Sequence, residues 1–154
     1  MKKLLILSFV LLFVLIGCAS IPTVVQTFST ERGSRPDGPD GFIIRNTQEL
    51  NDVLAIFPGM DNTFNNRFFR NYGLVVIENR SSATFFTLDL IEIEFRSDGV
   101  LFVLLEIIPR NAYPGQQMTS EVIVIRVRQS SLRNMKQLEI DFGMPIWTPP
   151  IIIP

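Results

Sequence analysis

The fold is read most directly from residues 88–108, whose sequence is LDLIEIEFRSDGVLFVLLEII. Apolar and charged residues alternate in its first half, which predicts a strand with one buried face and one solvated face. Asp98-Gly99 is the strongest short hairpin signal, because a type I′ turn needs positive φ at both central positions. The apolar run 100–108 predicts the returning strand. The stretch as a whole therefore predicts a β-hairpin.

Glu106 bears on the register of this hairpin, since it stands among apolar residues. A two-residue loop would place Glu106 opposite Ile91, on the apolar face. A loop longer by one residue, or a bulge, moves the carboxylate to the face of Glu92 and Glu94, because successive side chains of a strand point to opposite faces. An unpaired buried carboxylate costs on the order of several kcal/mol. We therefore expect the longer loop or a bulge, with a buried pair to Arg126 as the alternative.

One helix and further strands surround the hairpin. Asn46 followed by Glu49 is a capping-box pattern, and apolar residues at helical spacing continue to Pro58-Gly59. A second, short helix is expected before Gly73. The expected strands are residues 24–30, 42–45, 74–78, 84–95, 100–108, 121–129 and 138–142. The sequence predicts an α+β fold, a twisted, mostly antiparallel β-sheet with one amphipathic helix packed on it.

The composition limits the chemistry that this chain can perform. Its 154 residues fit one domain, and 47% apolar residues are enough for a core. Lys and Arg number 14 against 15 Asp and Glu, which argues against a nucleic-acid partner. The chain has no histidine and one cysteine, which excludes His-dependent catalysis, His-ligated metals and an internal disulfide framework. We expect no enzyme, no cofactor and no metal.

Carboxylates are the remaining route to catalysis. Glu92 and Glu94 share a strand face, but Arg96 shares it too, so we expect a solvated face rather than a catalytic acid pair. Asp37 and Asp40 lie in a turn-rich segment that lacks the spacing and terminal glutamate of an EF-hand. The sequence therefore predicts a non-catalytic protein.

The first residues have the pattern of a secretion signal. Lys2 and Lys3 precede an apolar run over residues 4–16, which is shorter than the roughly 17–25 residues of a membrane-spanning helix. Leu15-Ile16-Gly17-Cys18 resembles the lipobox of bacterial lipoproteins. In that family the cysteine is acylated before cleavage, so the resemblance implies that Cys18 becomes a first residue carrying acyl chains such as palmitate. The alternative is a secreted protein with an unpaired thiol.

The lipobox sets the expected organisation and location. We expect a lipoprotein signal peptide at 1–17, a lipidated tether at 18–23, a single domain at 24–144, and an apolar, Pro-rich tail at 145–154. Several acyl chains, at about 0.8 kcal/mol per buried CH₂, hold a protein firmly. Ala19 is not the aspartate that retains enterobacterial lipoproteins at the inner membrane. The expected location is the outer membrane of a two-membrane cell, and otherwise the outer face of the cell membrane.

Most of the mature chain resembles the C-terminal domain of the PrcB family, surface lipoproteins named for a spirochaete protease-complex subunit. The matching stretches are residues 30–34, 42–46, 48–50, 68–69, 74–77 and 88–95, with Pro109. A typical member has Thr-Gly-Gly-Tyr after its central strand, where this chain has Ser82-Ala83-Thr84-Phe85. The resemblance implies a small, extracytoplasmic α+β protein that is non-catalytic and assists a partner such as a secreted protease complex.

Two loops supply the candidate partner contacts. Loop 109–120 is long for a hairpin, and long loops are usually functional or mobile. Its Arg110, Tyr113 and Met118 are residue types favoured at protein interfaces. Loop 79–85 adds Phe85 as a fourth candidate. A Tyr113 that caps the core is the alternative for the longer loop.

Two further segments carry structural expectations. A basic stripe is expected to be a salt-bridged sheet face, and its members are Arg126, Arg128, Arg133 and Lys136. The tail, residues 145–154, is too rich in proline for an inner strand. We expect it to pack on the domain in an extended form, with an exposed docking peptide as the alternative.

The expected function is therefore that of a cell-envelope lipoprotein that binds a protein partner and contacts the membrane through its N-terminal lipid. The alternative is an envelope carrier or sensor of an apolar small ligand. A hollow above roughly 300 Å³ between helix and sheet would favour the carrier. A filled core with an exposed aromatic patch would favour partner binding.

Acylation at Cys18 gives the first prediction. The protein purified from bacterial membranes should begin at Cys18 and carry the added mass of its acyl chains. Because acylation precedes cleavage in lipoproteins, Cys18→Ser should retain Met1. Intact-mass spectrometry of both forms checks this, and a native protein with a free thiol or with Met1 present would contradict it.

Overall fold

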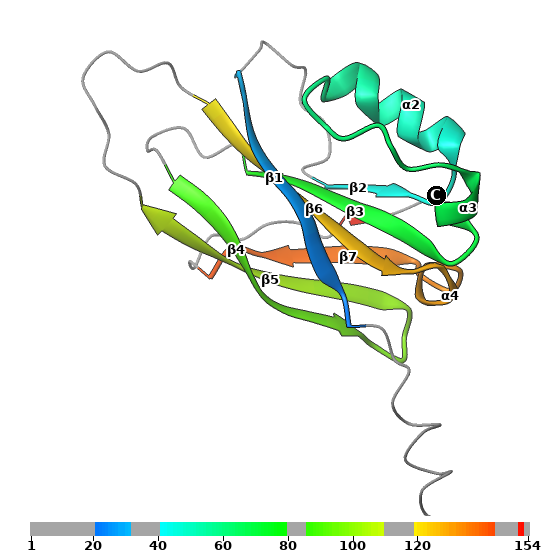
Figure 1. Cartoon of the computed structure of the whole chain (residues 1–154). Coiled ribbons are helices and arrows are strands. Elements are labelled where there is room, and N and C mark those ends of the chain that lie inside the picture. The colour runs from blue at the N-terminus through cyan, green and yellow to red at the C-terminus, as the bar shows by residue number, and fades with distance from the viewer. Residues whose placement is uncertain (1–20, 32–40, 80–85, 110–118, 144–150, 153–154) are drawn as a thin grey trace, which may run out of the picture.

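The computed structural model describes residues 21–31, 41–79, 86–109, 119–143 and 151–152. These residues form two stacked β-sheets, with a helix on the outer face of one of them (Figure 1). The elements are β1 Thr23–Glu31, β2 Gly41–Ile44, α2 Thr47–Ile56, α3 Asn66–Phe69, β3 Tyr72–Asn79, β4 Phe86–Phe95, β5 Val100–Pro109, β6 Thr119–Arg128, α4 Gln129–Leu132, β7 Gln137–Asp141 and β8 Ile151–Ile152. The predicted helices and strands are found near their expected positions.

The expected mostly antiparallel β-structure with an amphipathic helix packed on a sheet is confirmed, but the strands form two sheets rather than one, and the fold is mostly β rather than α+β. Sheet A has the strand order β1-β6-β3-β2 and is antiparallel, and sheet B has the order β4-β5-β7-β8, in which β5 and β7 run parallel. The described fold is thus mostly β, with mostly antiparallel pairing. A strand pattern reveals which face is apolar, but it does not reveal whether a helix or a second sheet covers that face. The described part of the tail is β8, an edge strand.

Sheet A is buried on both faces because its two central strands are apolar on both faces. One face packs on sheet B through Val75, Ile77, Ile123, Ile125, Leu101, Val103, Leu105 and Leu138. The other face packs on α2 through Leu74, Val76, Val122, Val124, Leu50, Val53 and Phe57. All of these side chains are buried. The interior thus consists of two filled apolar layers that share one sheet.

The predicted capping box at the start of α2 is confirmed in a shifted form. The Asn46 side chain accepts a hydrogen bond from the Glu49 N–H at 2.9 Å. The Glu49 carboxylate accepts one from the backbone N–H of Arg45 at 2.6 Å, rather than from that of Asn46. At the other end Phe57 meets Phe28 and Phe42 edge to face, with ring centroids 6.3 and 5.6 Å apart. Both ends of α2 are therefore fixed.

The hairpin has the longer loop, and it also has a bulge. Phe95 pairs with Leu101, and a register shift near Ile91 places Glu106 opposite Asp89. Glu106 is exposed, on the outer face of sheet B, as expected. The prediction of a type I′ turn is wrong. Such a turn needs positive φ at two positions, and between β4 and β5 only Gly99 has it, at 91°. The alternative of a buried pair with Arg126 is also wrong, since that arginine lies in sheet A opposite Thr23.

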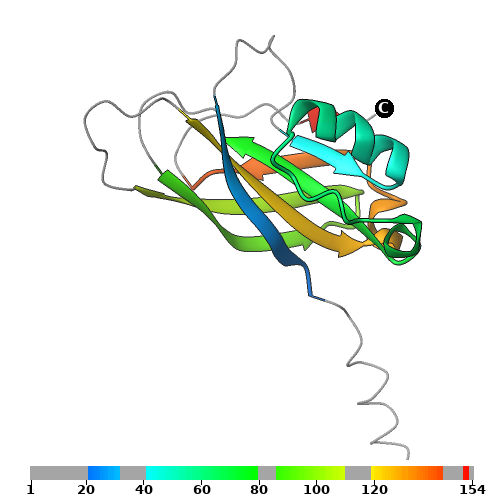
Figure 2. The same ribbon diagram turned by 45° about the horizontal axis from the view of Figure 1, so that its top comes forward.

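The two sheets have two distinct ends. At the entry end the chain enters β1, and the Tyr72–Arg128 and Val100–Gln137 pairs lie there. At the opposite loop end lie the pairs Asn79–Glu121 and Phe86–Pro109. Figures 1 and 2 show the chain entering β1 on the side of α3 and α4. No helix in the described ranges is long and apolar enough to span a membrane.

Gly73 is the glycine where the packing is tightest. A Cβ there would lie 2.3 Å from the Leu132 Cδ1 and 2.8 Å from the Ile44 carbonyl oxygen. Gly73→Ala should lower the free energy of unfolding by about 2 kcal/mol, as overpacked core variants do. Gly59→Ala is the control, because its Cβ would sit at an ordinary 3.4 Å from Phe28. Urea denaturation of both variants checks this, and equal losses would contradict it.

Candidate functional site

The strand residues that flank the two candidate contact loops lie together at the loop end. Loop 79–85 lies between β3 and β4, and loop 109–120 lies between β5 and β6. The strand residues that flank them form the cross-strand pairs Phe86–Pro109 and Asn79–Glu121. The predicted contacts themselves lie outside the described residues, as does the lipidation site; these are Phe85, Arg110, Tyr113, Met118 and Cys18. Both loops nevertheless leave the sheets from paired positions at one end.

The interior becomes polar at this end and is apolar elsewhere. The buried polar residues of the described ranges are Glu78, Asn79, Ser120 and Glu121. Glu121 and Asn79 face sheet B, because they are a cross-strand pair two residues from Ile123 and Ile77. The Ser29 hydroxyl donates a hydrogen bond to the Glu121 carboxylate at 2.6 Å. Three strands therefore meet around a buried carboxylate below the loops.

Sequence reasoning did not single out these buried carboxylates. Glu78 follows the apolar run 74–77, and Glu121 precedes the run 122–125. A charged residue at the border of an apolar strand is usually assigned to a solvated loop, because single charges are rarely buried. The sequence does place Glu78 and Glu121 at strand ends next to the two loops, and this position is the signal that could have identified them.

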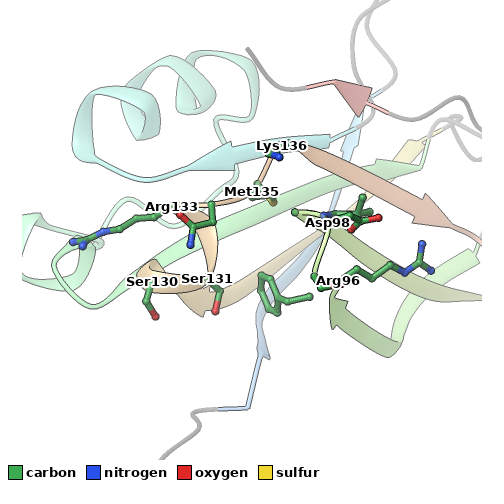
Figure 3. A pocket seen from close by; sticks show the side chains of 12 residues that line it. Arg96, Asp98, Ser130, Ser131, Arg133, Met135 and Lys136 are labelled. Atoms are coloured by element: carbon green, nitrogen blue, oxygen red, sulfur yellow. Dashed lines mark hydrogen bonds between the residues drawn. The ribbon is translucent and has the colours of Figure 1, made fainter.

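A polar hollow of about 610 Å³ lies at the entry end, between the β4–β5 turn and α4. Its lining includes Arg96, Asp98, Arg133 and Lys136. Figure 3 shows that the side-chain ends of Arg96, Arg133 and Lys136 point in different directions. Arg96 is held by Glu139 at 2.9 Å and by Glu94 at 3.3 Å. The charged groups do not converge on one point, so the hollow is a poor site for a single small anion.

A second hollow, of about 430 Å³, lies on sheet B. It is lined by Ile91, Leu104, Leu105, Glu106, Ile107, Phe142 and Gly143. Neither hollow has a lining residue from α2. Both therefore lie outside the space between helix and sheet where an apolar ligand was expected.

The predicted carboxylate pair lies on an open surface. Glu92 and Glu94 are exposed on the outer face of sheet B, and Glu94 is ion-paired with Arg96. Within the described ranges, no group of three or more Cys, Asp or Glu side chains is placed to hold a metal ion. Asp37 and Asp40 lie outside those ranges. Glu92 and Glu94 therefore lie on a solvated face, as expected.

The four residues of the predicted basic stripe do not share one sheet face. They lie at the entry end, where Arg126 and Arg128 belong to β6 but Arg133 and Lys136 belong to the connection between α4 and β7. Arg126 is half-buried, and its guanidinium carbon lies 5.0 Å from the centroid of the Tyr72 ring. Arg133 follows α4, and Lys136 precedes β7. The residues gather at one end because β6 stops there and the chain crosses to the other sheet.

Comparisons with protein-family models, with curated proteins and with solved structures find no match to this chain. The resemblance to the PrcB family therefore stays a prediction from the sequence. The features that bear on function are the geometry of the two ends and the sequence of the first 18 residues.

The bond between Ser29 and Glu121 generates a prediction about the loop end. Ser29→Ala should lower the free energy of unfolding by about 1 kcal/mol, because the bond to a charged group is lost at a partly exposed position. Ser29→Thr keeps the hydroxyl and should stay within about 0.5 kcal/mol of the wild type. Urea denaturation measures both, and equal effects of the two substitutions would contradict a role for the hydroxyl.

Proposed function

We propose that this protein is a lipid-anchored, non-catalytic component of the bacterial cell envelope that binds a protein partner through its loop end. One observation carries the proposal: the strand ends that flank the two loops lie at the opposite end of the sheets from the entry of the chain into β1. A lipid on Cys18 would hold the entry end close to the membrane. The loops would then face away from it.

The dimensions of the chain support this arrangement. Thr23 lies five positions after Cys18, and a fully extended chain covers at most about 18 Å over that length. The eight residues of β3 separate the two ends of sheet A by roughly 25 Å at 3.3 Å per residue. A partner bound at the loop end would therefore meet the protein clear of the lipid surface.

The filled interior supports binding at the surface rather than inside the domain. Both layers against sheet A are packed with buried apolar side chains, and Phe57 sits between two further rings. A carrier of an apolar ligand would need space there, and the two hollows lie elsewhere. We therefore place the partner contacts on Phe85, Arg110, Tyr113 and Met118.

The class of partner follows from the sequence resemblance. PrcB-like proteins assist a secreted protease complex, so the proposed partner is an extracytoplasmic protein complex of that kind. Aromatic and arginine side chains in loops are the residue types that supply most binding energy at protein interfaces. Such a role uses the surface of the domain and needs no catalytic residue.

Site-specific photo-crosslinking in intact cells tests the proposal. A photoreactive phenylalanine analogue placed at Tyr113 or Phe85 should capture the same protein from each position. The control position is Asn51, which is exposed on α2 away from both loops. Arg110→Ala combined with Met118→Ala should reduce capture at least tenfold, because interface anchors of this kind are each worth about 1–2 kcal/mol.

Two outcomes would contradict partner binding at the loop end. One is capture of nothing from Tyr113 and Phe85 in cells that express the protein at its normal level. The other is equal capture of the same proteins from Asn51. Thermal unfolding of each variant shows that a loss of capture is not a loss of folding.

A further inference from the structure

The entry end collects all of the described positive charge. Every lysine and arginine of the described ranges lies near a strand terminus at that end, in α3, or in a connection between elements there: Arg45, Arg67, Arg70, Arg96, Arg126, Arg128, Arg133 and Lys136. The chain as a whole is slightly acidic, with a net charge of −1. Among the described residues the positive charge is therefore concentrated at the entry end.

Hydrogen bonds join the connections that carry these cations into one unit. The Gln129 backbone N–H donates to the Asn71 carbonyl at 2.9 Å, and its side-chain amide donates to the Arg45 carbonyl at 3.0 Å. The Lys136 N–H donates to the Gly99 carbonyl at 2.9 Å. The termini of sheets A and B therefore form a continuous, fixed surface at this end.

Four cations on this surface are available to an external anion. Arg67, Arg70, Arg133 and Lys136 are exposed, and no ion pair holds them within the part of the chain that the structure describes. Arg96 differs, because Glu94 and Glu139 already neutralise it. The ends of Arg133 and Lys136 also point apart (Figure 3). Cations spread in this way match a plane that carries many anions better than they match one small ligand.

Exposed apolar side chains lie at the same end, around the first residues of β1. Ile21, Val24 and Val25 are among the most exposed large apolar residues of the described ranges, at 79%, 40% and 39%. They lie where the chain enters β1, next to the pair Thr23–Arg126. Apolar side chains rimmed by basic ones are the combination found in segments that lie on a membrane interface.

We propose that the entry end docks on an anionic phospholipid bilayer, with its exposed cations against lipid phosphates and Ile21, Val24 and Val25 in the interface. The proposal rests on the anchor at Cys18, three residues before Ile21 and thus at most about 11 Å from it along an extended chain. Anionic lipid attracts nearby Lys and Arg side chains. The domain then has a fixed orientation on the membrane, with its loop end facing outward.

Vesicle binding without the acyl chains tests the docking surface separately from the anchor. The probe is the mature chain 18–154 with Cys18→Ser, which contains every described element and is first checked for cooperative thermal unfolding. It should sediment with vesicles of equal phosphatidylglycerol and phosphatidylcholine at 50 mM NaCl. It should not sediment with phosphatidylcholine alone, and 500 mM NaCl should release it, because salt screens exposed charges.

Two variants with the same change in net charge locate the surface. Arg133→Gln with Lys136→Gln should weaken binding at least fivefold, since each basic residue near an anionic surface contributes about a fivefold change in affinity. Asn51→Asp with Ala55→Asp adds the same two negative charges at exposed positions of α2 and should change binding less than twofold. Equal weakening by both variants, or no binding to anionic vesicles, would overturn the proposal.

Orientation is measured on the acylated protein in the same vesicles. A fluorophore on Ser97→Cys, in the β4–β5 turn, should transfer energy to an acceptor lipid more efficiently than one on Ile108→Cys, near the loop end. Equal transfer from both positions would mean that the anchored domain tumbles freely, which also overturns docking. A native protein without acyl chains would remove the anchor but leave the vesicle result intact, so the two failures are distinguishable.

Discussion

Sheet A must be covered on both of its faces, and the rest of the structure depends on this constraint. Its central strands contain the apolar runs 74–77 and 122–125, and every side chain in those runs is buried. A strand exposes alternate side chains on opposite faces, so such a run cannot leave either face to water. The hairpin of β4 and β5 covers one face and α2 covers the other, and the three layers follow.

This layering places most connections between the strands at the two ends of the sheets. The strands cross the domain from one end to the other, so these connections lie at the entry end or at the loop end. The entry end is closed by hydrogen bonds among α4, the β4–β5 turn and the connections before α2 and β3. The loop end instead contains buried polar side chains, including the carboxylate of Glu121. The two ends thus differ in charge and in construction.

The proposed roles follow from this difference. The proposed recognition uses the surface of the domain, since apolar side chains fill both layers against sheet A. The cationic end, next to the proposed anchor, suits a lipid surface, and the opposite end carries the two loops proposed to meet a protein. An anchored adaptor needs such a polarity, because a partner site that faces the bilayer would be blocked.

The sequence by itself determined the local structure. Interactions between residues close in the chain determine the capping pattern at Asn46, the hairpin around Gly99 and the exposure of Glu106. Such features can be predicted from the spacing of apolar and polar residues along the chain. Only the tertiary structure decided that there are two sheets, that β5 and β7 run parallel and that the eight described cations share one end. Those features depend on which apolar faces pack against each other. Because the apolar faces of different strands are similar, their pairing is decided by the packing of the whole domain and not by the local sequence.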